Sequence, residues 1–336
     1  MKKVYILGII LSACTLFSSC NDEWKDELFT RMVSFKAPNG SNSVSDIYIR
    51  YQPDGSGSFQ LPVIVSGSQA NDQNVDVKIS VDNDTLAILN AEKYLDRRDL
   101  WYKQLPEQFY SFPTNGVCRI PAGRDVQIYD IDFHLKGLDL NEKWVLPLTI
   151  EADPSYELNI RKGYYKALLN LHLFNDYSGT YSATGMNVYL GESSNDPATA
   201  GTRNVRVVDD KSVFFYAGTW WEEDVYRDKY KVIVEFGEGT KDADGVVTGP
   251  LTVKAGDAAN EAQISSFGNC RYRRSVEPHP TQPYIELHTT VMYLSYYYTD
   301  VTSDPANPIL YRVIGNMSMQ RSVNKLIPDQ DQAIQW

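Results

Sequence analysis

Hydrophobic residues recur at every second position along most of this chain, and this alternation limits the possible folds more than any other feature. In residues 75–81 the valines and the isoleucine fall on one side of an extended strand, and Asp76, Lys78 and Ser80 fall on the other. Since successive side chains of a strand point to opposite faces, the segment predicts a strand with one buried face. Similar runs in the first half predict strands at 58–66, 117–120, 126–135, 144–151 and 164–174.

Turn-forming residues separate these runs, and only one helix is expected among them. Residues 84–95 have the length of a short helix, which Asp84 or Thr85 could cap through a side-chain oxygen. Short strands with few helices indicate an all-β fold. Their spacing favours an immunoglobulin-like β-sandwich over residues 31–175.

The second half, residues 176–336, keeps the alternation. We expect its strands at 179–190, 203–208, 212–217, 230–236, 251–255, 284–298 and 309–322. The run 284–298 is long and apolar on both faces, so one face can line a core while the other meets a partner or a pocket. An antiparallel meander of this length favours a β-barrel of the lipocalin type, with a second β-sandwich as the alternative.

The first residues have the composition of a secretory signal. Lys2 and Lys3 precede an apolar stretch at 4–16, and small residues lead to Cys20. Residues 16–20 resemble a bacterial lipoprotein cleavage site. The resemblance implies a signal peptide that ends before Cys20, whose thiol then carries a lipid.

An acidic run follows this cysteine. With the signal peptide at 1–19, a lipidated and acidic tether extends over 20–30. The acidic run looks like the signal that exports Bacteroidetes lipoproteins to the outer face of the outer membrane. We therefore expect a lipid-anchored protein on the extracellular side of the outer membrane.

Charge and cysteine content exclude some classes of function. The formal net charge is −11, and it becomes −13 once the two lysines of the signal are removed. Such a chain does not hold nucleic acid by bulk charge, because nucleic acid is a polyanion. Cys118 and Cys270 remain, one in each half, and two unpaired thiols are expected rather than a disulfide between the domains.

Several motifs resemble one known family. The first half is similar to the immunoglobulin-like domain of unknown function in Bacteroidetes surface lipoproteins, which are encoded beside SusC/SusD-like importers in polysaccharide-utilisation loci. The second half looks like the domain that accompanies it. The motifs that carry the resemblance lie at 84–90, 109–113, 120–123, 145–150, 175–181 and 311–317.

The resemblance implies a function in glycan capture. A protein of this kind binds an oligosaccharide at the cell surface and hands it to the SusC/SusD-like transporter complex, without chemistry of its own. Some members sit beside endo-β-N-acetylglucosaminidases, so host N-glycan is a candidate ligand. A structural or adhesin lipoprotein that binds no sugar is an alternative.

No metal or other cofactor is expected. The four histidines lie apart in the sequence without the spacing of a zinc site. Asp82 and Asp84 begin like a calcium loop, but Leu86 and Lys93 stand where oxygen ligands belong. An EF-hand is therefore excluded, and an irregular calcium site is the alternative.

Glu222 and Glu223 are the best candidates for paired catalytic carboxylates. A glycoside hydrolase holds two carboxyl groups on either side of the sugar, and one of them has a raised pKa. Adjacent carboxylates in an acidic loop point apart and stay solvated. We therefore expect no enzyme activity, and a hydrolase that uses these two residues remains the alternative.

Exposed aromatic rings are the stronger signal for sugar binding. Trp220 and Trp221 follow a predicted strand end, where indoles can stack on a pyranose while the neighbouring Glu222 and Glu223 accept hydrogen bonds from hydroxyl groups. The alternative is that the rings pack a domain interface or a barrel end. Further candidate sugar-binding residues are Trp101, Tyr102 and Tyr297.

Thr85 is a candidate for modification. Asp84-Thr85-Leu86 resembles the three-residue site at which Bacteroidetes attach O-glycans to exported proteins. The alternative is that Thr85 merely caps the short helix.

Overall fold

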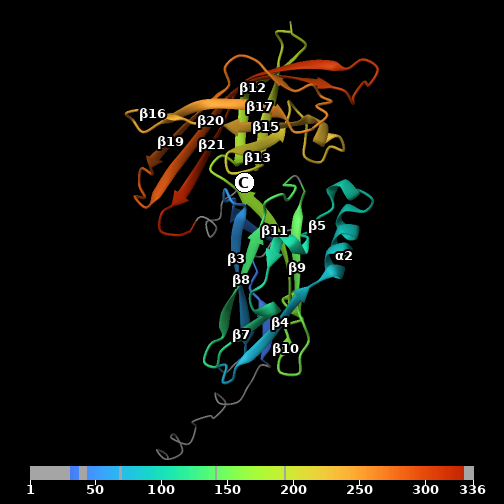
Figure 1. Ribbon diagram of the computed structural model, residues 1–336, viewed down its shortest axis with the longest axis vertical. Coiled ribbons are helices and arrows are strands. Elements are labelled where there is room, and N and C mark those ends of the chain that lie inside the picture. Colours follow the sequence, from blue (N-terminus) through green and yellow to red (C-terminus); the bar gives the residue numbers. More distant parts are fainter. Residues whose placement is uncertain (1–30, 38–43, 68–69, 141, 193, 329–336) are drawn as a thin grey trace, which may run out of the picture.

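The computed structural model describes residues 31–37, 44–67, 70–140, 142–192 and 194–328. The predicted signal peptide, the lipidated Cys20 and the acidic tether lie outside these residues. Figure 1 shows two β domains placed end to end along the long axis of the molecule. Among the described helices, none is long and apolar enough to cross a membrane.

The N-terminal domain contains two sheets with an apolar core. One sheet has the strand order β10-β1-β3-β8-β6, and the other has the order β2-β11-β9-β4-β7, with β5 beside β9. The first comprises β1 (Met32–Phe35), β3 (Ser56–Ser66), β6 (Tyr110–Ser111), β8 (Val126–His134) and β10 (Glu157–Leu158). The second comprises β2 (Ser45–Arg50), β4 (Val75–Val81), β5 (Lys103–Gln104), β7 (Val117–Ile120), β9 (Trp144–Ile150) and β11 (Lys166–Phe174).

Alternation explains how these sheets pack. Val75, Val77 and Ile79 of β4 enter one core cluster with Leu61 and Ile131 of the opposite sheet. The polar residues between them on β4 face outward. The predicted β-sandwich is therefore confirmed.

One helix, α2 (Asn83–Tyr94), covers the outer face of the second sheet. Its cap is Asp82, not Asp84 or Thr85, because the Asp82 carboxylate accepts hydrogen bonds from the backbone N–H groups of both. Leu86 of the helix packs with Val145 of β9 and with an apolar residue of β11. Five 3-10 turns complete the described helical structure: η2 (Arg98–Leu100), η3 (Glu107–Phe109), η4 (Pro113–Gly116), η5 (Arg161–Gly163) and η6 (Arg227–Tyr230).

The C-terminal domain is a closed antiparallel ring. Its strands pair in the order β12-β13-β14-β15-β17-β19-β20-β21, and β21 pairs with β12 again. This closure favours the barrel over the second sandwich that the sequence left open. The strands are β12 (Gly179–Leu190), β13 (Ala198–Val207), β14 (Ser212–Tyr216), β15 (Lys231–Phe236), β16 (Thr240–Lys241), β17 (Val247–Ala255), β18 (Ser265–Ser266), β19 (Arg271–Pro278), β20 (Ile285–Asp300) and β21 (Ile309–Asn324).

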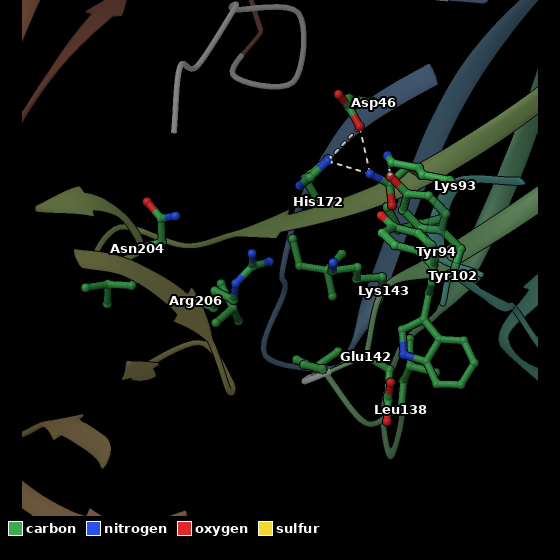
Figure 2. Close-up of a pocket in the computed structure, with 17 residues that line it drawn as sticks. Asp46, Lys93, Tyr94, Tyr102, Leu138, Glu142, Lys143, His172, Asn204 and Arg206 are labelled. Carbon is green, nitrogen blue, oxygen red and sulfur yellow. Dashed lines mark hydrogen bonds and ion pairs between the residues drawn. The ribbon is translucent and has the colours of Figure 1, made fainter. Parts of the chain in front are cut away.

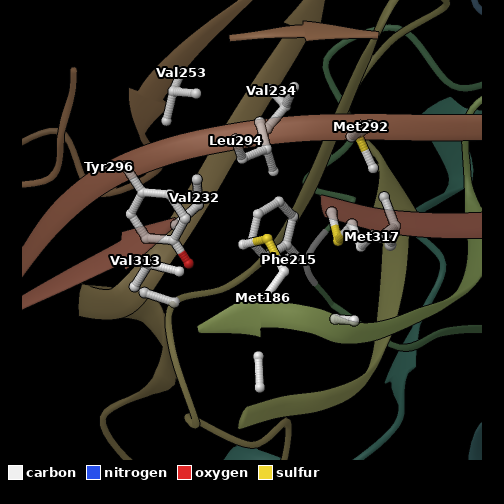
Figure 3. Packing of buried hydrophobic residues seen from close by; sticks show 14 of the residues in the cluster. Met186, Phe215, Val232, Val234, Val253, Met292, Leu294, Tyr296, Val313 and Met317 are labelled. Carbon is white, nitrogen blue, oxygen red and sulfur yellow. The ribbon is translucent and has the colours of Figure 1, made fainter. Parts of the chain in front are cut away.

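Side chains fill the interior of this barrel, as Figure 3 shows. Met292, Leu294 and Tyr296 of β20 point inward and are almost fully buried, together with Phe215 of β14 and Met317 of β21. The alternate residues of β20 face outward and are half-buried. The predicted strand with apolar residues on both faces is thus present as β20. Its inner face is part of a packed core and does not line an open ligand cavity.

An ion-pair bridge joins the two domains close to the chain crossing. β11 ends at Phe174, and the Asp176 carboxylate contacts Arg50 of the N-terminal domain and Arg274 of β19, both at 2.8 Å. The pKa of Asp176 is lowered, because the two arginines outweigh the effect of burial, which would raise it. The bridge therefore fixes the point from which the barrel extends.

Cys118 and Cys270 are both free and buried, one in each domain. Burial raises the pKa of the Cys118 thiol to about 12. The two unpaired thiols that the sequence predicted are thus present, one in each domain.

Candidate functional site

A cavity of about 330 Å³ lies where the second sheet of the sandwich meets β13 of the barrel. Its size falls at the lower end of the range of roughly 300–1,000 Å³ that is typical of ligand pockets. Figure 2 shows its lining side chains, which come from both domains. They belong to residues Asp46, Lys93, Tyr94, Tyr102, Leu138, Leu140, Glu142, Lys143, Trp144, Asn170, Leu171, His172, Leu173, Asn204, Val205, Arg206 and Val207. We call this cavity the interdomain cleft.

A hydrogen-bonded cluster of Asp46, Asn170 and His172 forms one wall of the cleft. Parallel pairing of β2 with β11 places Asp46 opposite Asn170. The Asp46 carboxylate lies 2.8 Å from Nε2 of His172 and accepts a 2.7 Å hydrogen bond from the Asn170 amide. These contacts, with the one from His172 strongest, lower the pKa of Asp46 although partial burial opposes them.

Aromatic rings form the second wall. The rings of Tyr94 and Tyr102 meet edge to face, with centroids 5.7 Å apart. Tyr102 is fixed to α2 because the buried Asn90 side chain accepts from its N–H and donates to its carbonyl, both at 2.8 Å. The indole of Trp144 donates a 2.6 Å hydrogen bond to the Asp139 carbonyl. These rings are therefore held in place by the N-terminal domain.

The barrel contributes Asn204 and Arg206 from β13. The Arg206 guanidinium holds both carboxylate oxygens of Glu222, at 2.7 and 3.2 Å. Burial would raise the pKa of Glu222, but Arg206 outweighs it and the pKa is lowered. A general acid needs the opposite shift, so Glu222 has the surroundings of an anchoring residue rather than of a proton donor.

Trp220 and Trp221 do not form one exposed platform. Trp220 stacks on the buried ring of Tyr230, with centroids 3.8 Å apart and planes 8° from parallel, and it packs against the barrel core. Trp221 is 64% exposed, with the Arg203 guanidinium 5.6 Å from its ring. The expectation that both indoles lie exposed is therefore corrected, and only Trp221 offers an open face.

The loop that carries Trp221 also contacts the N-terminal domain. Arg97 donates a 2.8 Å hydrogen bond to the carbonyl of Glu223, and Arg227 donates one of the same length to the carbonyl of Asp99. Trp101 follows this segment of the N-terminal domain, half-buried, with the Arg98 guanidinium 5.5 Å from its ring. The contacts between the domains thus bring the loop that carries Trp221 close to the segment that precedes Trp101.

Tyr297 and Thr85 lie elsewhere. Tyr297 is half-buried on the outside of the barrel against Phe267, with ring centroids 4.5 Å apart. The Thr85 hydroxyl donates a 2.6 Å hydrogen bond to Asp82 and accepts one from Lys166. Its glycosylation stays a prediction, which the intact mass of the native protein would test.

Of the predicted sugar-binding residues, Tyr102 lines the interdomain cleft and Glu222 adjoins it through Arg206. Sequence reasoning missed the polar residues of the cleft. A signal was present in β11, where Asn170 and His172 interrupt an otherwise apolar strand at alternate positions. Their partner Asp46 lies 126 residues from His172, and only the fold brings it near.

In the described part of the chain, no group of three or more His, Cys, Asp or Glu residues is placed to hold a metal ion. Asp82, the first residue of the segment that begins like a calcium loop, instead caps α2 and forms an ion pair with Lys166 at 2.8 Å.

Comparisons with known proteins agree with the two-domain division. The sequence model of a domain of unknown function, DUF4973, matches residues 24–154, and a model described as a C-terminal domain matches residues 165–318. Among curated proteins, none matches the chain.

Three solved structures resemble the whole chain. A multidomain protein including DUF1735 from Bacteroides ovatus is 40% identical, with a TM-score of 0.77 over 90% of this chain and 99% of that one. A protein of unknown function from the same species is 32% identical, with a TM-score of 0.79 over 93% and 97%. An auxiliary nutrient binding protein from Bacteroides thetaiotaomicron VPI-5482 is 31% identical, with a TM-score of 0.75 over 89% and 98%.

These identities extend over nearly the full length of each relative, so they concern both domains and not one shared module. The chain therefore belongs to the same protein family as these Bacteroides proteins, with a DUF4973 domain in its N-terminal half.

Proposed function

We propose that this chain is a carbohydrate-binding protein that captures oligosaccharide in the interdomain cleft. The observation that carries the proposal is the composition of the cleft, which is lined both by the rings of Tyr94, Tyr102 and Trp144 and by the hydrogen-bonding groups of Asp46 and Asn204. A sugar has apolar C–H faces and polar hydroxyl edges, and such a lining matches both. The relative described as an auxiliary nutrient binding protein supports a role in nutrient capture.

We further propose that binding occurs without hydrolysis. Retaining and inverting glycosidases both need a carboxyl group with a raised pKa opposite a second carboxylate. Of the two glutamates considered for this role, Glu222 is bound by Arg206 and has a lowered pKa. Asp46 lines the cleft, but its pKa is also lowered.

The proposed setting is the outer face of the outer membrane. Lipidation of Cys20 and export by the acidic tether would place the cleft outside the cell, where a SusC/SusD-like importer receives the captured sugar. The lipobox-like segment and the acidic run support this setting. Host N-glycan is the candidate ligand that the resemblance adds.

A glycan panel on the soluble chain that starts at Asn21 tests the proposal. We expect at least one oligosaccharide class to bind, with no release of shorter products. His172→Ala should weaken that binding about tenfold or more, because it removes a cleft side chain together with the partner that orients Asp46.

His134→Ala is the matched control, since His134 lies on β8 outside the interdomain cleft. It should bind as the wild type does. Binding that survives His172→Ala unchanged would move the site away from the cleft, and release of shorter sugars would favour the hydrolase. Failure of every glycan, with a stable complex to the importer, would favour a structural lipoprotein.

A further inference from the structure

Two lysines of the interdomain cleft form no direct ion pair with a carboxylate in the part of the chain that the structure describes. Glu142 pairs with Lys103 at 2.6 Å, and Arg206 pairs with Glu222 at 2.7 Å. Lys93 and Lys143 also line the cleft, but within the described ranges neither forms an ion pair with a carboxylate.

Both ammonium groups instead lie near the same aromatic ring. Nζ of Lys93 is 5.1 Å and Nζ of Lys143 is 5.4 Å from the centroid of Tyr94. Lys93 also donates a 3.2 Å hydrogen bond to the Tyr102 hydroxyl. Two cations therefore converge on one side of the cleft, although the chain as a whole has a net charge of −11.

Neighbouring groups respond to this local positive charge. Burial would raise the pKa of Tyr94, but a hydrogen bond with Tyr102 and the charges of Lys143 and Lys93 outweigh it and lower the pKa. Lys143 also contributes to the lowered pKa of Glu222, after the larger effect of Arg206. The positive charge thus extends across the cleft from the sandwich toward the barrel.

Figure 2 shows Lys143 and Arg206 facing the same space from opposite domains, with His172 beside it. The Asp46 carboxylate is engaged by His172 and Asn170, and the charge of Lys93 adds to their lowering of the Asp46 pKa. An anionic group of a ligand is therefore stabilised near Lys143, while hydroxyl groups suit the end at Asp46.

We propose that the oligosaccharide bound in the interdomain cleft is acidic, and that its carboxylate or sulfate lies beside Lys143 and Lys93. This inference rests on the proposed function and narrows its ligand to one chemical class. A neutral sugar would leave both ammonium groups without a direct ion pair, whereas an acidic sugar would form charge-assisted hydrogen bonds with them.

Matched pairs of oligosaccharides test the inference on the same soluble chain. The probes are oligogalacturonides and unsulfated chondroitin oligosaccharides, each beside its carboxyl-reduced form, and chondroitin sulfate beside its desulfated form. Each pair keeps the linkage and changes the charge, and the two kinds of pair distinguish carboxylate from sulfate. Titration calorimetry at low and at high NaCl gives the affinities.

We expect an acidic member to bind at least tenfold more tightly than its neutral counterpart, with a preference that shrinks as salt rises. Lys143→Gln should remove the preference, and Lys143→Arg should keep most of it. Lys241→Gln makes the same charge change on β16 and should have no effect. Unchanged melting temperatures would show that all variants are folded.

The outcomes separate this inference from the proposed function. Three outcomes would overturn the acidic ligand but not the proposal of sugar capture. They are equal binding of charged and neutral forms, binding of neutral glycans alone, and a preference that survives Lys143→Gln. Absence of binding by every probe and by the general glycan panel overturns both.

Discussion

At the scale of single residues, neighbours in the sequence have different roles. Trp220 is part of the packing around the barrel core, and Trp221 faces solvent. Both are tryptophans after the same strand, so composition alone could not separate them. They differ because the ring of Trp220 stacks on Tyr230. Tyr230 lies 10 positions after Trp220 in the sequence, and only the fold brings the two rings together.

Alanine at each tryptophan separates these roles. Trp220→Ala should lower the free energy of unfolding by about 2–4 kcal/mol, because it removes a stacked ring from the edge of the core. Trp221→Ala should change it by less than about 0.5 kcal/mol, since its ring is 64% exposed. Denaturant titration of both variants measures the difference, and equal losses would contradict the assigned roles.

Glu222 makes stability depend on acid. Burial would raise the pKa of Glu222 in the folded state, but Arg206 outweighs burial and the pKa is lowered. The stability that Glu222 contributes is therefore fully present above the unfolded pKa of about 4.3. That contribution is lost as the pH falls through the folded pKa. Glu222→Gln should therefore be less stable than the wild type at pH 7, and the gap should narrow between about pH 5 and pH 3.

The neighbouring Glu223→Gln is the control, because Glu223 is exposed, accepts a hydrogen bond through its backbone carbonyl, and has a smaller effect than Glu222 on the Arg206 pKa. Its stability should follow the wild-type curve across this pH range. A gap for Glu222→Gln that stays constant as the solution is acidified would mean that the Arg206 pair does not lower the pKa.

At the scale of elements, strands with clear alternation could be predicted, including the four-residue β7, and the two-residue strands and the polar β19 could not. The alternation predicted β4, β12, β20 and β21 closely, because each has one face in a core. β19 was missed, since Arg271, Arg273 and Arg274 surround Tyr272, the one residue of this strand that is buried in the barrel core. The interdomain cleft was missed for a related reason, because Asp46 and His172 meet only through parallel pairing of distant strands.

The cap of α2 gives a test at this scale. Asp82→Ala should destabilise the sandwich by about 1–2 kcal/mol or more, because it removes the N-cap and the partner of Lys166 together. Asp84→Ala changes an exposed acid in the same turn and should cost much less. Hydrogen exchange of α2 would locate the effect, and equal protection in both variants would argue against Asp82 as the cap.

At the scale of the whole molecule, both domains contribute walls to the interdomain cleft. The Asp176 bridge near the chain crossing and the contacts of Arg97 and Arg227 at the tryptophan loop hold the barrel against the sandwich. Neither domain alone contains the complete set of cleft residues, as Figure 2 shows. Separate domains should therefore bind an oligosaccharide more weakly than the intact chain.

Location is the second question at this scale. Cys20→Ala should abolish membrane association if this residue carries the lipid. Replacing Asp22, Glu23, Asp26 and Glu27 by Ala should leave the protein anchored but protected from protease added outside intact cells. Unchanged protease access in the charge variant would remove the argument for export by the acidic run.

A crystal structure of the chain with the oligosaccharide that binds it best would show whether sugar is captured between the two domains. We expect the sugar to hydrogen-bond Asp46 or His172 on one side and to reach Lys143 or Asn204 on the other, packed against Tyr94 or Tyr102. A sugar that instead lies only on Trp221 or on the outer face of β20, with the interdomain cleft empty, would contradict this expectation.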